Sequence, residues 1–296
     1  MYNLVGRLRI ELEREDKKLV DFHIHTTFSD GTFTPEEVVK MAAESGMKAI
    51  AVTDHDSVEG TARARSACEQ AGIEFVSGIE ISTDYMGKEV HILGYFINEK
   101  DEEFLGILKE LQEERGRRTE KIIKRLNELN IRITMSDVLN ESTSGLISRN
   151  HIASAMLKRG YVYSRGAAFH EYLGSSGAAY IPKTAVTPEK AVEMITKNGG
   201  VAVMAHPHLL PLGAEKFDQF LKYLKSYGLK GIEGYYNGFE QKEINIYRRI
   251  ADENGLIVTG GSDFHGLTRD GVKIGAANVP DTVYFEMKSA AGKKEE

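Results

Sequence analysis

The sequence predicts an α/β fold of the β/α-barrel type, and three observations indicate it. Short apolar segments with strand-like composition alternate with segments that have helical spacing and helix start signals. The apolar segments are hydrophobic at nearly every position, as expected for parallel strands buried on both faces. Candidate functional side chains follow these segments directly. In a β/α barrel such side chains gather at the carboxyl ends of the strands.

The first apolar segment, residues 20–26, ends in two histidines with a single residue between them. Because alternate side chains of a strand share a face, His23 and His25 are expected to point the same way. Asp30 follows five residues after the second histidine. Two imidazoles fixed on one face at the end of a strand make half of a metal site.

The same arrangement of an apolar run followed by ligand-type residues recurs at four other points. The runs cover residues 49–53, 75–79, 201–205 and 256–262. The side chains that follow them are Asp54, His55 and Asp56, then Glu80, then His206 and His208, and finally Asp263 and His265. A single histidine at a strand end is a weak signal, but five coincidences of one kind indicate a shared site.

Helical stretches separate these runs and begin with recognisable start signals. Thr34 before Pro35, and Thr187 before Pro188, each place an N-cap candidate ahead of a proline at the first helical position. Another helical stretch opens at Ser57 and runs to Gly72. Strand followed by helix, repeated, favours a parallel α/β arrangement.

His91 lies within a strand-like run, residues 87–95, instead of following one. With residues 84–87 as the turn, this run is expected to pair with the strand around residues 79–82 as a hairpin. Such pairing would bring His91 close to Glu80. Spacing alone leaves two interpretations open, a metal ligand and an ordinary strand histidine.

Residues 99–186 interrupt the alternation of strands and helices. They contain a long helical stretch from about Asp101 to Leu129, a short one near residues 135–140, and a capped helix start at Ser148. We expect an inserted helical lobe over the barrel mouth, which is where substrate selection belongs.

The chain of 296 residues is therefore expected to have three parts. Residues 1–98 are the first part of the barrel, with residues 1–18 as an N-terminal extension. Residues 99–186 are the lobe, and residues 187–296 are the second part of the barrel. The hydrophobic fraction of 41% suffices for a sizeable core.

Composition and charge narrow the class of protein. The net charge of -6 argues against a basic surface that clamps duplex nucleic acid, although bound divalent metals would let an acidic protein bind a small anion. The single cysteine, Cys68, excludes a disulfide framework and a thiolate metal site, so metal ligation must use His and carboxylates. The charged start is unlike a signal peptide, and no apolar run approaches about 18 residues. We expect a cytoplasmic protein that does not cross a membrane.

Taken in order, the motifs resemble those of the polymerase and histidinol phosphatase superfamily, abbreviated PHP. They are His-x-His-(x4)-Asp, Thr-Asp-His-Asp, Gly-Ile-Glu, a later His, Ala-His-Pro and Gly-Ser-Asp-x-His. The resemblance covers the chain from Leu19 to about Val279. It implies a distorted, TIM-like (β/α)7 PHP barrel. Within the superfamily, the chain resembles bacterial phosphoesterases that remove the 3′-phosphate of 3′,5′-nucleotide bisphosphates and trim short RNA from its 5′ end.

The resemblance also implies a centre of two or three divalent metals. One metal would be held by His23, His25, Glu80 and Asp263, a second by Glu80 as a bridge with His91 and His206, and a third by Asp30, His55 and His265. Mn²⁺ is the first expectation, with Fe, Zn or Mg as alternatives, because the order of metal affinities does not decide which ion is used.

This centre suits the hydrolysis of phosphate esters. Metals about 3.5 to 4 Å apart can share a hydroxide, orient it and neutralise charge on the phosphoryl oxygens. A metal-activated hydroxide is therefore the expected catalytic group. His208 is a candidate proton donor to the leaving oxygen, with an outer or exposed position as the alternative interpretation.

Three residues of the lobe segment are candidates for binding a second phosphate. Arg149 and His151 match a Ser-Arg-x-His pattern, and Lys183 a Pro-x-Lys pattern, of the resembled family. A guanidinium offers a planar fork and an ammonium a point charge. Each residue also has an ordinary interpretation: Arg149 pairs with a carboxylate, His151 is a polar residue of the helix start, and Lys183 is exposed.

We therefore expect a metal-dependent phosphoesterase for 3′,5′-nucleotide bisphosphates, for the 5′ ends of short RNA, or for both. One alternative is a phosphatase of another small phosphomonoester, such as histidinol phosphate, which would need no second phosphate site. A second alternative is a non-catalytic, metal-binding partner of a polymerase, and the intact ligand set argues against it. The expected partner is thus a small anionic phosphate ester, a nucleotide or short RNA.

Overall fold

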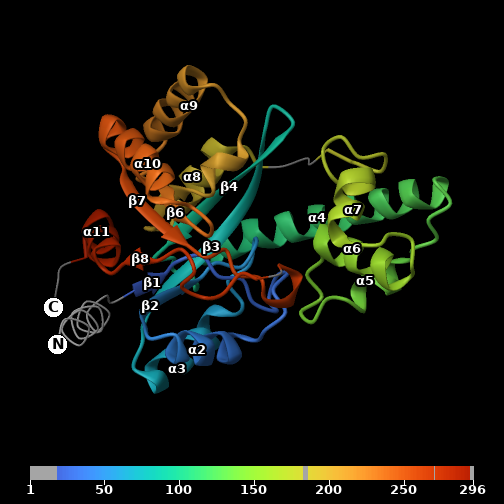
Figure 1. Ribbon diagram of the computed structural model, residues 1–296, viewed down its shortest axis with the longest axis horizontal. Helices are drawn as coiled ribbons and strands as arrows, with labels where there is room; N and C mark the ends of the chain where they lie inside the picture. The colour runs from blue at the N-terminus through green and yellow to red at the C-terminus, as the bar shows by residue number, and fades with distance from the viewer. Residues whose placement is uncertain (1–18, 183–185, 270, 294–296) are drawn as a thin grey trace, which may run out of the picture.

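The computed structural model describes residues 19–182, 186–269 and 271–293. Within these residues the strands form one eight-stranded sheet in the order β7-β6-β5-β4-β3-β2-β1-β8, curled into a nearly closed barrel (Figure 1). The strands are β1 (Leu19–Asp21), β2 (Met47–Val52), β3 (Glu74–Tyr85), β4 (Lys88–Tyr95), β5 (Val201–Met204), β6 (Gly231–Tyr236), β7 (Ile257–Gly261) and β8 (Val279–Pro280).

The barrel closes where the chain after β1 meets β7. The Phe22 amide donates a hydrogen bond to the Gly260 carbonyl at 3.2 Å, and Ile24 forms a parallel bridge with Phe264. A Cβ atom added at Gly261 would lie 2.3 Å from the His23 amide nitrogen, so this approach requires glycine. The closure places the first and the last predicted ligand motifs side by side.

The predicted hairpin is confirmed, because β3 and β4 pair antiparallel with Ser82 opposite His91. Met86 and Gly87 form its two-residue turn, and both have positive φ angles, 53° and 77°, as a type I′ turn requires. The expected parallel arrangement holds for β1–β2–β3 and β5–β6–β7. It fails at β4, which is antiparallel to β5 as well, and at β8, which is antiparallel to β1. A tight turn reverses the chain at β4, where a crossover helix would have kept it parallel.

Helices surround the barrel, and their start signals operate as predicted at two points. Thr34 caps α2 with a reciprocal capping box, and Thr187 occupies the N-cap position before Pro188 of α8, although its side chain makes no capping hydrogen bond. The stretch expected from Ser57 forms a helix only from Thr61, because the residues before it bend and turn at the site. The helices around the barrel are α2 (Pro35–Glu44), α3 (Thr61–Ala71), α8 (Pro188–Lys197), α9 (Ala214–Ser226), α10 (Gln241–Asn254) and α11 (Thr282–Ala290).

A long helix, α4 (Glu102–Glu128), carries the lobe that Figure 1 shows beside the barrel. Asp101 caps it by accepting a hydrogen bond from the Phe104 amide at 3.0 Å, as expected for a helix from about Asp101 to Leu129. The other lobe elements are α5 (Met135–Leu139), α6 (Arg149–Lys158), α7 (Arg165–Ala168) and a π-helical turn η1 (Phe169–Leu173).

The lobe has a hydrophobic cluster of its own. Ile122 and Leu126 of α4 pack there with Ile152 and Met156 of α6, whereas Phe104 at the start of α4 belongs to a barrel cluster. Helix α4 thus links two separately packed regions. The division of the chain at 98/99 and 186/187 stays a prediction.

Two expectations concern the rest of the chain. The N-terminal extension, residues 1–18, lies outside the described residues. No helix in the described part of the chain combines the length and the apolar character needed to cross a lipid bilayer. Cys68, the single cysteine, is buried in α3.

Candidate metal centre

The barrel collects all nine side chains predicted as metal ligands at one end. Eight of them are buried, and His91 is partly buried. They come from the chain after β1 (His23, His25, Asp30), the chain after β2 (His55), β3 (Glu80), β4 (His91), the chain after β5 (His206) and the chain after β7 (Asp263, His265). Their role as ligands is still a prediction, but their convergence is a feature of the fold.

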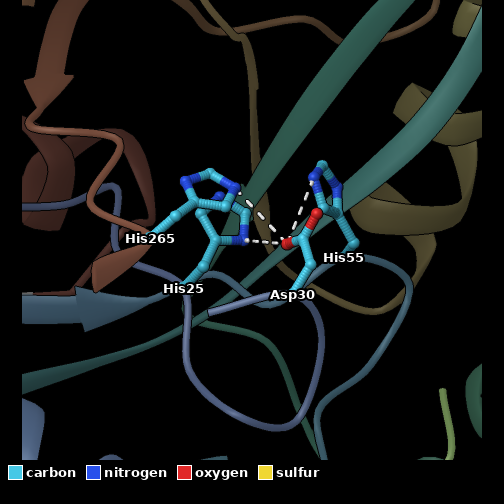
Figure 2. A group of neighbouring side chains, drawn as sticks. All are labelled: His25, Asp30, His55 and His265. Atoms are coloured by element: carbon cyan, nitrogen blue, oxygen red, sulfur yellow. Dashed lines mark ion pairs between the residues drawn. The ribbon is translucent and has the colours of Figure 1, made fainter. Parts of the chain in front are cut away.

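Asp30 lies at the centre of one group of four side chains (Figure 2). Its Oδ1 atom is 3.3 Å from Nε2 of His265 and 3.9 Å from both Nε2 of His55 and Nδ1 of His25. The rings of His25 and His265 stack with their centroids 4.0 Å apart. One carboxylate therefore faces three imidazoles from three different strand ends.

Glu80 lies at the centre of the whole assembly. Its two carboxylate oxygens face five imidazoles, at distances from 2.9 to 3.4 Å: His91 (Nδ1, 2.9 Å), His206 (Nε2, 3.0 Å), His55 (Nδ1, 3.1 Å), His25 (Nε2, 3.2 Å) and His23 (Nε2, 3.4 Å). The predicted proximity of His91 to Glu80 is confirmed. A carboxylate in this position can bridge ions.

Asp263 is shared between the imidazoles and two groups that hold it. Its Oδ1 atom lies 3.4 Å from Nε2 of His25 and 3.5 Å from Nε2 of His23. Its Oδ2 atom accepts a hydrogen bond from the Tyr236 hydroxyl at 2.6 Å and pairs with Arg269. The φ angle of Asp263 is 53°, a left-handed conformation that turns the chain sharply at the end of β7.

The carboxylates and imidazoles shift each other's pKa values strongly. Burial acts to raise the pKa of Glu80, but the surrounding imidazoles outweigh it and hold that pKa well below its usual value. Burial acts to lower the pKa of His25 and His91, but the neighbouring carboxylates raise both to about 9. At His55 burial prevails and lowers the pKa to about 3. Such opposed shifts are typical of functional sites.

The cluster fits metal ions, because several buried side-chain atoms that can bind a metal make no hydrogen bond. Among the described residues, Nε2 of His23, His25 and His91 and Oδ1 of Asp30 are buried and have no hydrogen-bond partner. Leaving such atoms unsatisfied is costly unless a ligand occupies the space between them. Imidazole and carboxylate together form a donor set for divalent transition metals. The buried His, Asp and Glu side chains are thus consistent with several metal ions.

The geometric groups overlap more than the three predicted ligand sets. They are His25-Asp30-His55-His265, His23-His206-Asp263, His23-His25-Glu80 and His55-Glu80-His91. The first contains the whole predicted third set and adds His25. Because several members occur in two groups, the division into three separate ions stays a prediction.

Residues around the cluster hold the ligands in place. Asp54 accepts hydrogen bonds from the Thr26 amide at 2.7 Å and the Ser29 hydroxyl at 2.6 Å, which fixes the loop that carries Asp30. Asn150 of the lobe donates to Oδ2 of Asp30 at 2.7 Å. The lobe therefore touches the cluster directly.

A cavity of about 460 Å³ opens over the cluster, between the barrel and the lobe. Arg115, Arg118 and Arg149 line it together with Glu80 and Asp263. Arg149 pairs with Glu89 of β4, donates to the Leu173 carbonyl at 3.2 Å and lies 5.6 Å from the Phe169 ring centre. The ordinary interpretation of Arg149, pairing with a carboxylate, is thus present together with a position in the cavity wall.

The remaining predicted residues lie elsewhere. His151 accepts a hydrogen bond from the Ser148 amide at 3.0 Å, so one ring nitrogen serves the start of α6, and burial lowers its pKa. His208 is exposed, as its alternative interpretation has it, and its ring centre lies 4.5 Å from that of Tyr236 and 5.0 Å from that of Phe239. Lys183 lies outside the described residues. The roles predicted for these three residues stay predictions.

Sequence reasoning missed several residues that contact the cluster. Glu233 lies inside an apolar strand, Arg269 in a loop without a motif, and Asn150 beside the predicted Arg149. Of these three residues, only Glu233 could have been recognised from the sequence, because an isolated carboxylate in a buried strand needs a partner.

The family follows from a comparison with known proteins. A family model, described as the PHP domain, matches residues 21–259 of the chain. The chain belongs to this family. It is accordingly a hydrolase of phosphate esters, with a cluster of ligand-type residues that suits metal-dependent chemistry.

Two relatives and one solved structure are similar to this PHP chain over most of their length. The 5′-3′ exoribonuclease of Haemophilus influenzae is 30% identical over 248 residues, which cover 84% of this chain and 90% of that protein. The 3′,5′-nucleoside bisphosphate phosphatase of Chromobacterium violaceum is 30% identical over 257 residues, which cover 86% and 90%. The structure of an amidohydrolase from Chromobacterium violaceum, with bound sulfate and no metal, has 29% identity and a TM-score of 0.82, covering 92% and 96%.

Proposed function

We propose that this PHP phosphoesterase removes the 3′-phosphate of 3′,5′-nucleotide bisphosphates, and that it also trims the 5′ ends of short RNA. The names of the two relatives support this substrate class. The observation that carries the proposal is the arginine pair, Arg118 and Arg149, in the wall of the cavity that the ligand cluster also lines. A substrate with two phosphates can place one at each side of this cavity.

The cluster of nine residues is the end of the cavity where the ester would be cleaved. We propose that it holds up to three ions, with Mn²⁺ as the first candidate. Bound divalent ions would polarise the phosphoryl oxygens and make water a nucleophile at neutral pH. The chain's own contribution is positioning: Tyr236 and Arg269 hold Asp263, and Asn150 holds Asp30.

Arg118 and Arg149 supply the second anchor. Arg118 is buried, donates through Nε to the Ile181 carbonyl at 2.8 Å and lies 5.7 Å from the Tyr180 ring centre. Burial lowers the pKa of Arg118 to about 10, and repulsion from the nearby Arg149 acts in the same direction. A phosphate dianion would relieve this repulsion and accept paired hydrogen bonds from the guanidinium groups.

An adjoining cavity supports the second activity. It measures about 360 Å³, shares Arg118, Arg149 and Phe169 with the first cavity, and adds Tyr180. Aromatic rings beside cationic side chains are the usual platform for single-stranded nucleic acid, because bases stack on the rings while cations bind the backbone. The two cavities together extend beyond the size of one nucleotide, as trimming of short RNA would require.

The deciding experiment measures phosphate release from three substrates in the presence of Mn²⁺. Adenosine 3′,5′-bisphosphate is compared with adenosine 3′-monophosphate, which lacks only the second phosphate, and with histidinol phosphate. We expect kcat/KM to be about 10- to 100-fold higher for the bisphosphate, which is the value of one charge-assisted contact. Removal of metal with a chelator should abolish all turnover.

The substitution Arg149→Ala then tests the anchor. It should remove the preference for the bisphosphate and leave hydrolysis of the 3′-monophosphate almost unchanged. Arg117→Ala is the matched control, because Arg117 neighbours Arg118 on α4 but faces solvent and pairs with Glu114. Equal turnover of bisphosphate and monophosphate by the unmodified protein would contradict the proposed substrate. Absence of turnover with every substrate would favour the non-catalytic alternative.

A further inference from the structure

Glu233 of β6 is a fully buried carboxylate that contacts two residues of the ligand cluster. Its exposed fraction is 0%, and it does not belong to any of the four geometric metal groups of the described residues. Oε1 lies 2.9 Å from Nδ1 of His23, and Oε2 accepts a hydrogen bond from the His206 backbone amide at 2.6 Å. Both oxygens of one side chain are thus used, and both contacts go to predicted metal ligands.

The contact with His23 determines which ring nitrogen carries a proton. A carboxylate only accepts hydrogen bonds, so Nδ1 of His23 must donate to Glu233 and keeps its hydrogen. The neutral ring then has its lone pair on Nε2. That atom lies 3.4 Å from Glu80 and 3.5 Å from Asp263, and it is buried without a hydrogen bond. Glu233 therefore directs the metal-binding atom of His23 toward the cluster.

The contact with His206 fixes a strained piece of backbone. His206 has φ 27° and ψ 60°, a left-handed conformation that costs free energy for any residue other than glycine, and Pro207 follows it. A hydrogen bond from its amide to a buried carboxylate offsets part of that cost. In this conformation Nε2 of His206 lies 3.0 Å from Oε1 of Glu80. The orientation of Nε2 of His206, its predicted metal-binding atom, thus also depends on Glu233.

We propose that Glu233 is a positioning residue that sets the metal-binding geometry of His23 and His206 together. The two histidines come from different strands, and their rings stack with centroids 5.8 Å apart. One carboxylate couples them, so its loss affects two ligands at once. The proposal rests on the metal-binding role of the cluster within the proposed function.

Glu233→Gln tests this coupling with a nearly isosteric change. An amide has one accepting oxygen and one donating nitrogen, so it cannot satisfy both contacts. If its oxygen accepts from the His206 amide, its nitrogen donates to Nδ1 of His23, and the ring proton moves to Nε2. If its oxygen serves His23 instead, the His206 amide loses its acceptor. Either arrangement damages a ligand.

The experiment measures binding of Zn²⁺ by calorimetric titration, without any substrate. We expect Glu233→Gln to weaken at least one Zn²⁺ site by about 10- to 100-fold, as loss of partners behind metal-binding histidines does. Asp21→Asn is the matched control. Asp21 is also fully buried beside His23, but it contacts no imidazole ring: it accepts hydrogen bonds from the backbone amides of Ser262 at 2.9 Å, Gly275 at 2.7 Å and His23 at 3.3 Å. This control should lose stability and retain Zn²⁺ affinity.

A second measurement needs no variant and therefore does not depend on folding of Glu233→Gln. The chain has nine histidines, so selective ¹⁵N-histidine labelling gives a tractable spectrum of the Zn²⁺-loaded protein. His23 should show a proton on Nδ1 and the metal on Nε2. The opposite tautomer would overturn the proposal.

Two further outcomes would also overturn it: unchanged Zn²⁺ affinity in Glu233→Gln, or equal weakening in Asp21→Asn. Failure of the proposed function is a separate result. If the unmodified protein binds Zn²⁺ with the predicted His23 tautomer but does not cleave the bisphosphate, the substrate assignment fails and the role of Glu233 stands.

Discussion

The ligand cluster and the cavity wall formed by the lobe differ in how their side chains are held. Glu80 is 1% exposed and faces five imidazoles, and the cluster residues follow or lie within strands of one closed sheet. Arg149 of the lobe is held by three contacts with two other elements, namely Glu89 of β4 and, in η1, the Leu173 carbonyl and the Phe169 ring. The lobe also packs around its own hydrophobic cluster. The difference supports the proposal that the barrel fixes the chemistry while the lobe selects the substrate.

The largest expected effect comes from removing the central carboxylate of the barrel. Glu80→Gln should lower kcat/KM for every phosphate ester by at least about 1,000-fold, because the site loses a charge that faces five imidazoles and that bound ions would share. Metal content should fall in parallel, measured by mass spectrometry of the purified protein. Glu74→Gln, on the same strand but away from the cluster, is the control. If Glu80→Gln lost activity on bisphosphates alone, the division of roles between barrel and lobe would be wrong.

A second prediction concerns stability, which should depend on pH differently in the ligand cluster and in the lobe. In the metal-free protein, neighbouring carboxylates raise the pKa of His25 and His91 to about 9, against about 6.5 in an unfolded chain. The folded state therefore binds more protons between these values. The stabilisation is complete below about pH 6.5 and is lost as the pH rises to about 9.

The measurement is the Tm of chelator-treated protein across this range, compared with Zn²⁺-loaded protein. Tm should fall with rising pH in the first sample and stay nearly constant in the second, because ligated imidazoles are neutral. In the lobe, hydrogen bonds from Arg159 and Thr134 lower the pKa of Asp137 to about 2, so its contribution is lost only in acid. A metal-free Tm that rises toward pH 9 would refute the charge balance described for the cluster.

The smallest effect is expected where the two regions touch. Asn150→Ala removes the 2.7 Å hydrogen bond from the lobe to Asp30 and should weaken metal binding or turnover by about 10-fold. Asn245→Ala, on the exposed face of α10, controls for loss of an asparagine side chain. Steady-state kinetics at several Mn²⁺ concentrations would show the change as a higher metal requirement. An unchanged requirement would mean that the lobe does not help to hold the cluster.

The ligand cluster was largely predictable from the sequence for a physical reason. Strands of a barrel end at one rim, so ligand-type residues after several apolar runs must meet there. The position of His91 near Glu80 could be predicted from the hairpin, because antiparallel pairing fixes which residues of β3 and β4 face each other. The antiparallel pairing of β4 with β5 could not be predicted in this way. It depends on a partner more than one hundred residues later in the chain.

The lobe contacts were less predictable because they are long-range and lack a periodic signal. Arg149 was identified as a candidate, but its partner Glu89 lies on the barrel hairpin, 60 residues away. His151 illustrates the opposite limit, since one polar residue near a helix start suits both a ligand and a cap. Glu233 and Arg269 act on the ligands from the second layer of contacts, which no spacing rule connects to the motifs.

Strand β4 extends past the ligand cluster, and this extension joins the two regions. Side chains alternate along a strand, so Glu89 and His91 share one face of β4. One contacts Arg149 of the lobe and the other contacts Glu80 of the cluster. Insertion of a single residue between them would turn one of them to the opposite face. The spacing of these two side chains therefore sets where Arg149 of the lobe lies relative to the cluster.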